Sequence, residues 1–185
     1  MANFTEQAIK QAFIKLLEKQ SLTKISVKNI VEECGINRNS FYYHFQDIPQ
    51  LVESIVTEQA NKLIAAYPSF NSLEECFRVA FNFGLKNKKA IMNIYNSVNK
   101  DYFVNAALLT CEKTVTNYVN TAFPDMKSDV NDAAAIIKVL KCLLFGLIID
   151  WINSGMPDDA LDDIENVIEF SKDIPAAIVA KSKDF

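Results

Sequence analysis

The sequence predicts an all-α protein with a small N-terminal three-helix domain and a C-terminal helical bundle, about nine helices in total. The chain of 185 residues contains only four Gly and five Pro, and 50% of its residues are hydrophobic. This composition favours long helices over a turn-rich β fold. In most segments the apolar residues recur at intervals of three and four, which is the spacing of one helix face. We expect two domains, residues 1–50 and residues 51–185.

The first predicted helix follows Thr5, whose side-chain oxygen is suited to cap a helix N-terminus. Its apolar residues share one face: Ile9, Ala12, Phe13, Leu16 and Leu17. We expect this face to form one wall of a small core, together with Phe41 and Phe45 from further along the chain.

Two short helices separated by a glycine turn are predicted within residues 25–45. Ser26 is placed to cap the first of them, and Gly35 follows its last turn, where a left-handed residue ends a helix at little steric cost. Asn37 is placed to cap the second helix. Two helices joined by so short a turn must cross steeply, as in a helix-turn-helix motif. The apolar stripe of the first helix contains Val27, Ile30, Val31 and Cys34.

The second of these helices carries side chains that a core does not require. Phe41 and Phe45 point one way, and the opposite face is polar and aromatic. Such a face is typical of a helix that enters the major groove of DNA. We expect five residues to contact bases or nearby backbone: Arg38, Asn39, Ser40, Tyr42 and Tyr43. Asn37 or Asn39 is expected to read adenine. Phosphates are expected to be held by Ser26, Lys28 and His44.

Two other interpretations of this helix stay open. The aromatic side chains are incidental on a solvent face, or the tyrosines are buried against the helix that follows.

The helix that follows is predicted to begin near Ile48, with Asp47 as its cap. Further helices are predicted over residues 73–84, 91–95, 102–123, 130–153 and 158–174.

The segment 139–152 is apolar nearly all the way round, so the core of one chain does not easily cover it. With Lys141 and Asp150 inside it, the segment is shorter than the about 20 apolar residues of a membrane span. We therefore expect a homodimer and no membrane association; the alternative is a fully intramolecular core. The predicted dimer contacts are Leu140, Leu143, Leu144, Leu147, Ile148, Trp151, Ile164 and Ile168.

The first about 60 residues resemble the DNA-binding domain of the TetR family of bacterial transcriptional regulators. The resemblance rests on the apolar first helix, on Ile25-Ser-Val-Lys-Asn-Ile, on Cys34-Gly-Ile and on Asn37-Arg-Asn-Ser-Phe-Tyr-Tyr-His-Phe45. Cys34 stands where the family usually has a small residue, and Ile48 stands where a phosphate-binding lysine is common. This second departure puts one backbone contact in doubt.

The resemblance also implies a dimer formed by the last two helices and a cavity for a small-molecule effector between the middle helices. Aromatic and amide side chains in the middle of the chain are suited to line such a cavity, although aromatic residues at helical spacing are also ordinary core. The predicted ligand contacts are Phe77, Phe81, Tyr95, Asn99, Tyr102, Phe103 and Tyr118.

Taken together with this resemblance, the sequence predicts a ligand-responsive repressor that binds a pseudo-palindromic operator in double-stranded DNA as a dimer. The alternative is a helical adaptor or co-regulator that binds a partner protein, or that needs an effector before it binds DNA. The net charge is −4, but residues 1–47 hold six Lys/Arg and five Asp/Glu. A nearly neutral reading head predicts weak non-specific binding and a strong dependence on base contacts.

Catalysis is not expected, because the chain has one His and no phosphate loop or nucleophile motif. The four cysteines are far apart, without C-x-x-C spacing, so we expect buried structural thiols and neither a metal nor a cofactor. No charged-then-apolar segment at the N-terminus suggests export, and we expect a cytoplasmic protein.

Overall fold

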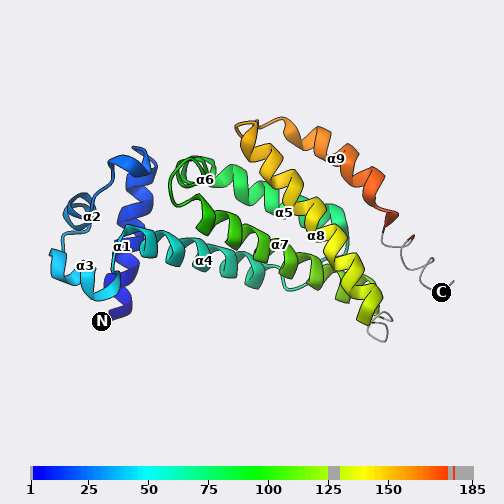
Figure 1. Cartoon of the computed structure of the whole chain (residues 1–185), viewed down its shortest axis with the longest axis horizontal. Helices are drawn as coiled ribbons and strands as arrows, with labels where there is room; N and C mark the ends of the chain where they lie inside the picture. Colours follow the sequence, from blue (N-terminus) through cyan, green and yellow to red (C-terminus); the bar gives the residue numbers. More distant parts are fainter. Residues whose placement is uncertain (1, 125–129, 175–176, 178–185) are drawn as a thin grey trace. The chain divides into compact units, whose positions relative to one another are not determined.

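The computed structural model describes residues 2–124, 130–174 and 177. Within these residues the chain forms nine α-helices, one short 3-10 helix and no strand, which confirms the all-α prediction (Figure 1). The elements in chain order are α1 (Ala2–Leu17), η1 (Leu22–Lys24), α2 (Val27–Cys34), α3 (Arg38–His44), α4 (Ile48–Ala66), α5 (Leu73–Lys86), α6 (Lys88–Tyr95), α7 (Lys100–Ala122), α8 (Val130–Asn153) and α9 (Ala160–Ser171).

Contacts divide the chain into two compact units. The head unit comprises Met1–Ala60 and Asn87–Ala106, and the bundle unit comprises Asn61–Lys86 and Ala107–Phe185. The head unit therefore takes in α6 and the start of α7 as well as the helix-turn-helix. This division by contacts extends beyond the predicted residues 1–50, and a functional boundary at residue 50 stays a prediction.

One hydrophobic core holds the head unit together. Helix α1 supplies a row of fully buried side chains, and α2, α3 and α4 pack against it. Helix α6 joins this core through Ile94, and the Asn93 side-chain amide donates a hydrogen bond of 2.8 Å to the carbonyl of Leu17 at the end of α1. The largest buried residues of this core are Ile9, Phe13, Leu17, Ile30, Phe41 and Leu51.

The start of the chain differs from its prediction. Thr5 does not cap α1, because the helix already begins at Ala2 and Thr5 lies inside it. The residues before Thr5 include neither Gly nor Pro, so nothing in them stops the helix from extending toward the N-terminus. The short helix η1, which has no apolar period long enough to reveal it, was also not predicted.

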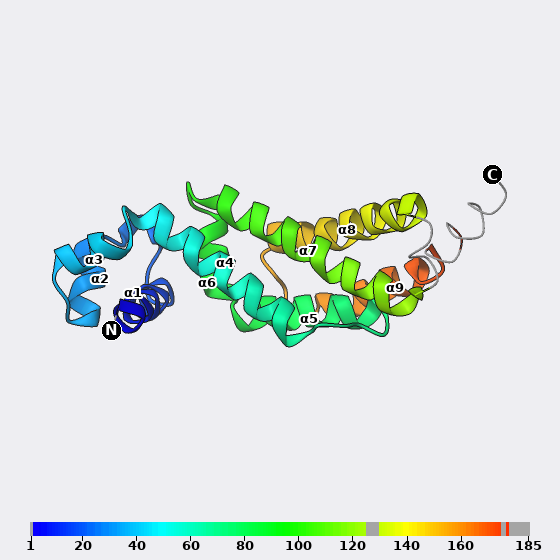
Figure 2. The same cartoon turned by 90° about the horizontal axis from the view of Figure 1, so that it is seen from below.

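In the bundle unit, α5 packs against α8 and α9 (Figures 1 and 2). The Phe81 ring lies 4.2 Å from the Trp151 ring between centroids, and the Trp151 indole N–H donates a 2.9 Å hydrogen bond to the Pro157 carbonyl. The predicted stop after α8 is confirmed, since the helix ends at Asn153 and Gly155 has φ +88°. Among the described residues, no helix has the length and hydropathy to cross a bilayer.

We predict that Gly84→Ala destabilises the bundle unit by about 1–3 kcal/mol. A Cβ at this position would lie 2.5 Å from Trp151 Cζ3, so the indole must move although it is held by its hydrogen bond to Pro157. The midpoint of urea unfolding, followed by far-UV circular dichroism, measures the effect.

Asn82→Ala is the matched control, because Asn82 is exposed on the same helix and gains only helix propensity. A Gly84→Ala protein as stable as the Asn82→Ala protein would contradict the close packing of Trp151 on α5.

Candidate nucleic-acid interface

Helix α2 is fixed at both ends by local hydrogen bonds. Ser26 Oγ accepts from the Asn29 N–H at 3.3 Å, and the Ser26 N–H donates to Asn29 Oδ1 at 2.9 Å, which together form a capping box. At the other end Gly35 has φ +70°, the left-handed conformation predicted for it. The Ser26 hydroxyl also donates to Asn29 Oδ1 at 2.6 Å, so it must give up this bond before it donates to a phosphate.

The recognition helix α3 is capped by Asn37, as predicted. Asn37 Oδ1 accepts from the Ser40 N–H at 2.8 Å and from the Ser40 hydroxyl at 3.1 Å. Asn37 and Ser40, which were both predicted to contact DNA, are therefore hydrogen-bonded to each other at the start of α3. An adenine contact through the Asn37 oxygen would compete with the cap, whose loss costs about 0.5–2 kcal/mol.

One face of α3 is buried and the opposite face is exposed. Phe41 and Phe45 are 0% and 4% exposed in the head core, whereas Tyr42 and Tyr43 are 55% and 79% exposed. The interpretation that these tyrosines are buried against the next helix is therefore wrong. The Tyr42 ring rests edge-on against Phe41 with centroids 5.5 Å apart, which orients it without covering it.

The polar residues of α3 complete this outward face. Arg38 and Asn39 are exposed in its first turn, and Ser40 and His44 are half-buried. The His44 ring lies edge-on to Tyr43 with centroids 5.1 Å apart. Arg38, Asn39, Tyr42 and Tyr43 thus lie together on one exposed helix surface, which we call the reading face. Its residue types match those that contact base edges and phosphates in major grooves.

Lys28 is the lysine that was expected to hold a phosphate. Lys28 is 65% exposed and its ammonium lies 3.8 Å from Glu32 Oε1, a weak surface pair that leaves the side chain accessible to a phosphate. Ile48, at the position where a lysine is common, is partly buried and packs on the head core. Ile48 therefore contributes packing to the head core and no charge to a phosphate contact.

The start of α4 is fixed by two local hydrogen bonds. The Gln50 N–H donates to Asp47 Oδ1 at 2.8 Å, which confirms Asp47 as the cap, and the Gln46 N–H donates to Gln50 Oε1 at 2.6 Å. The roles of Asn29 and Gln50 were not predicted. The spacing of a capping residue followed three positions later by an amide was the signal for both.

The predicted ligand contacts are divided between the two units. Phe77, Phe81 and Tyr118 are buried in the bundle unit, whereas Tyr95, Asn99, Tyr102 and Phe103 belong to the head unit. Phe103 packs on the head core, and Tyr95 lies edge-on to Phe103 with centroids 6.1 Å apart. The role of these residues in ligand binding stays a prediction.

The thiols lie in different environments. Cys76 and Cys111 are buried, and burial raises the pKa of each thiol to about 12, so both are protonated and poorly nucleophilic at neutral pH. Cys34 is half-buried. Cys142 is exposed on α8, so the expectation of four buried thiols is wrong for this residue. The sequence did not indicate this because α8 is apolar nearly all the way round, which hides the side that one chain leaves uncovered.

The predicted dimer contacts also differ in burial. Leu143, Leu147 and Ile148 are half-buried, and the side chain of Ile164 lies outside the described residues. Buried within one chain are Leu140, Leu144, Trp151 and Ile168. Their contact with a partner subunit stays a prediction.

Two solved structures share this fold. The dihydroxyacetone kinase operon activator DhaS is 18% identical with a TM-score of 0.60, and the match covers 92% of this chain and 97% of that one. A TetR transcriptional regulator from Rhodococcus sp. RHA1 is 13% identical with a TM-score of 0.59, covering 94% and 97%. At these identities the likeness shows the fold alone. A comparison with curated proteins found no match.

Two family models match separate parts of the chain. Residues 9–55 match the model described as bacterial regulatory proteins, tetR family, and residues 71–173 match the transcriptional regulator C-terminal region of such proteins. The first match contains the capped helix-turn-helix, and the second spans more than half of the chain. The chain therefore belongs to the TetR family of bacterial regulatory proteins and is a DNA-binding transcriptional regulator, not an enzyme.

Proposed function

We propose that this regulator reads a pseudo-palindromic operator as a homodimer and represses transcription until an effector binds. The observation that carries the proposal is the reading face, where Arg38, Tyr42 and Tyr43 are exposed on a helix that is capped at its start and buried on its opposite side. A rigid helix with an exposed arginine and two exposed tyrosines is suited to bidentate guanine contacts and to packing on sugars and thymine methyl groups.

The low charge of the head supports reading of bases over general attraction to DNA. Lys28 and Arg38 are exposed, but residues 1–47 carry nearly balanced charges. Non-specific affinity comes from phosphate neutralisation, so it should be weak here. Useful affinity must then come from base contacts and from using two heads at once.

A stripe on α8 supports the homodimer. Ala135, Val139, Cys142 and Gly146 are all exposed and lie at helical spacing, so α8 presents a small apolar surface after its other side is buried in the bundle unit. Apart from the nearby backbone of α8 itself, no heavy atom lies within 4 Å of a Cβ built on Gly146, which leaves room for another backbone. On α9, Phe170 is 86% exposed. A second copy would cover this α8 stripe.

A two-fold dimer would read an operator made of two inverted half-sites. Two recognition helices on successive major grooves lie about 34–36 Å apart, so each head reads one half of an inverted repeat. The binding of an effector and the repression of transcription are proposed from membership of the family and not from particular residues of this chain. One similar structure is named an operon activator, and its 18% identity carries the fold but not that role. A helical adaptor for a partner protein is the competing function.

Selection of bound duplexes from a randomised DNA pool is the first test. We expect a pseudo-palindrome, and we expect Arg38→Ala or Tyr42→Ala to weaken binding to it by about 10- to 100-fold through lost base contacts. Both side chains are exposed, so the thermal unfolding midpoint should stay unchanged.

Lys28→Ala is the control, because the loss of a phosphate contact lowers the affinity for all duplexes alike and reduces the salt slope by about one. A folded dimer that enriches no motif, with or without candidate effectors, would favour the adaptor.

The dimer is tested by substitutions that one chain tolerates. We expect Val139→Glu and Gly146→Leu to shift the protein toward monomer in sedimentation at micromolar concentration. Val139 is 42% exposed and Gly146 faces open space, so neither change disturbs the core of one chain. Leu109→Glu on α7 is the matched control, since Leu109 is also exposed and lies outside the α8 stripe. A dimer that survives both α8 changes would exclude this interface.

A further inference from the structure

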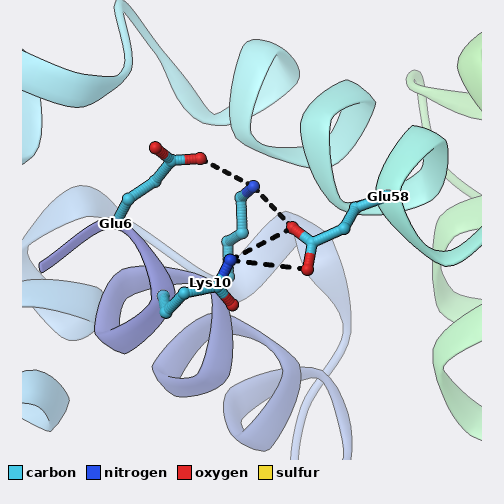
Figure 3. Close-up of polar contacts among 4 residues, drawn as sticks. Glu6, Lys10 and Glu58 are labelled. Carbon is cyan, nitrogen blue, oxygen red and sulfur yellow. Dashed lines mark hydrogen bonds and ion pairs between the residues drawn. The ribbon is translucent and has the colours of Figure 1, made fainter. Parts of the chain in front are cut away.

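A lysine is buried in the head unit between two carboxylates. Lys10 of α1 is 7% exposed, and its ammonium lies 2.8 Å from Glu6 Oε1 and 2.7 Å from Glu58 Oε2 (Figure 3). Glu6 is on α1, one turn before Lys10, but Glu58 is on α4. The Gln7 side-chain amide of α1 also donates to both Glu58 oxygens at 3.4 Å. Two side chains of α1 therefore hold one carboxylate of α4.

The same ammonium lies near the end of the recognition helix. Its nitrogen is 6.0 Å from the centroid of the Phe45 ring, at the outer limit of a cation–π contact. Phe45 ends α3, where its N–H donates to the Phe41 carbonyl at 2.9 Å, and α4 begins at Ile48. Lys10 thus lies where α1, α4 and the end of α3 meet.

The two carboxylates keep the buried Lys10 side chain charged. Burial by itself lowers the pKa of the ammonium, but hydrogen bonds and charges from Glu58 and Glu6 outweigh it and raise the pKa. The side chain is therefore charged at neutral pH, and separation of α4 from α1 would leave a buried cation with half of its partners. Charge-assisted hydrogen bonds are short and roughly twice as strong as neutral ones, so a displacement of α4 from α1 that lengthens this contact is opposed more strongly than the same displacement of apolar side chains.

We propose that Lys10, paired with Glu58, is a positioning residue for DNA reading, which fixes α4 and the end of α3 against α1 and thereby sets the direction of the reading face. This role rests on the proposed function, because it concerns how the head discriminates an operator. Base contacts need side chains placed within about 0.5 Å, and α3 takes its position from the elements on either side of it.

The test uses two variants with the same change in charge. Glu58→Gln and Glu6→Gln each remove one negative charge from the head and one partner from Lys10, but only the first weakens the link between α1 and α4. The measured quantity is the ratio of affinities for the selected operator and for a scrambled duplex of equal length. We expect Glu58→Gln to lower this ratio by about tenfold or more, with scrambled-duplex affinity unchanged relative to Glu6→Gln. We expect Glu6→Gln to keep the wild-type ratio.

A structural role alone would lower both affinities in proportion to the unfolded fraction, so the thermal midpoint is measured beside the ratio. Lys10→Met combined with Glu58→Leu removes the charges together and should remain folded, because an apolar pair needs no partner. The proposal expects a reduced ratio in this folded double variant. A wild-type ratio in the double variant, or in Glu58→Gln, overturns it. A wild-type protein that prefers no duplex overturns the proposed function together with this role.

Discussion

The burial of Phe41 and Phe45 is the contact on which the reading head depends. Helix α3 spans Arg38–His44, and a helix so short is unstable in water without tertiary packing. These two rings anchor it in a core shared with α1, α2 and α4. Residues four positions apart share one face of a helix, so the burial of Phe41 and Phe45 turns Tyr42 and Tyr43, which lie between them in sequence, away from the core. The core therefore selects the reading face as a consequence of its own packing.

Around this anchor, polar side chains divide into those that hold the helices and those that remain available. Asn37, Ser26 and Asp47 satisfy backbone N–H groups at the starts of α3, α2 and α4. The side-chain oxygens of Ser26 and Asn37, which were expected to contact DNA, are therefore already engaged in holding the helices. Arg38 and Tyr42 retain exposed side chains, which is why base discrimination is assigned to them.

The bundle unit follows a different constraint, the close approach of α5 and α8. Gly84 lets the Trp151 indole lie directly on α5, and the indole N–H closes the turn after α8 by bonding Pro157. This contact orients α8 so that Leu140 and Leu144 are buried while Val139 and the rest of the α8 stripe stay exposed. The apolar character of the whole helix is thus divided between the core of one chain and the surface proposed for a second copy.

Local signals determined the helices, most of their caps and the reading face, because hydrophobic period, capping residues and Gly35 act within a few positions of one another. The sequence could not show that α6 joins the head core or that Lys10 meets Glu58 of α4, since both contacts join residues far apart in the chain. Nor could the spacing of apolar residues in α8 distinguish its buried side from its exposed side, because the helix is apolar nearly all the way round. Only tertiary packing decides which apolar face the chain covers and which it leaves open.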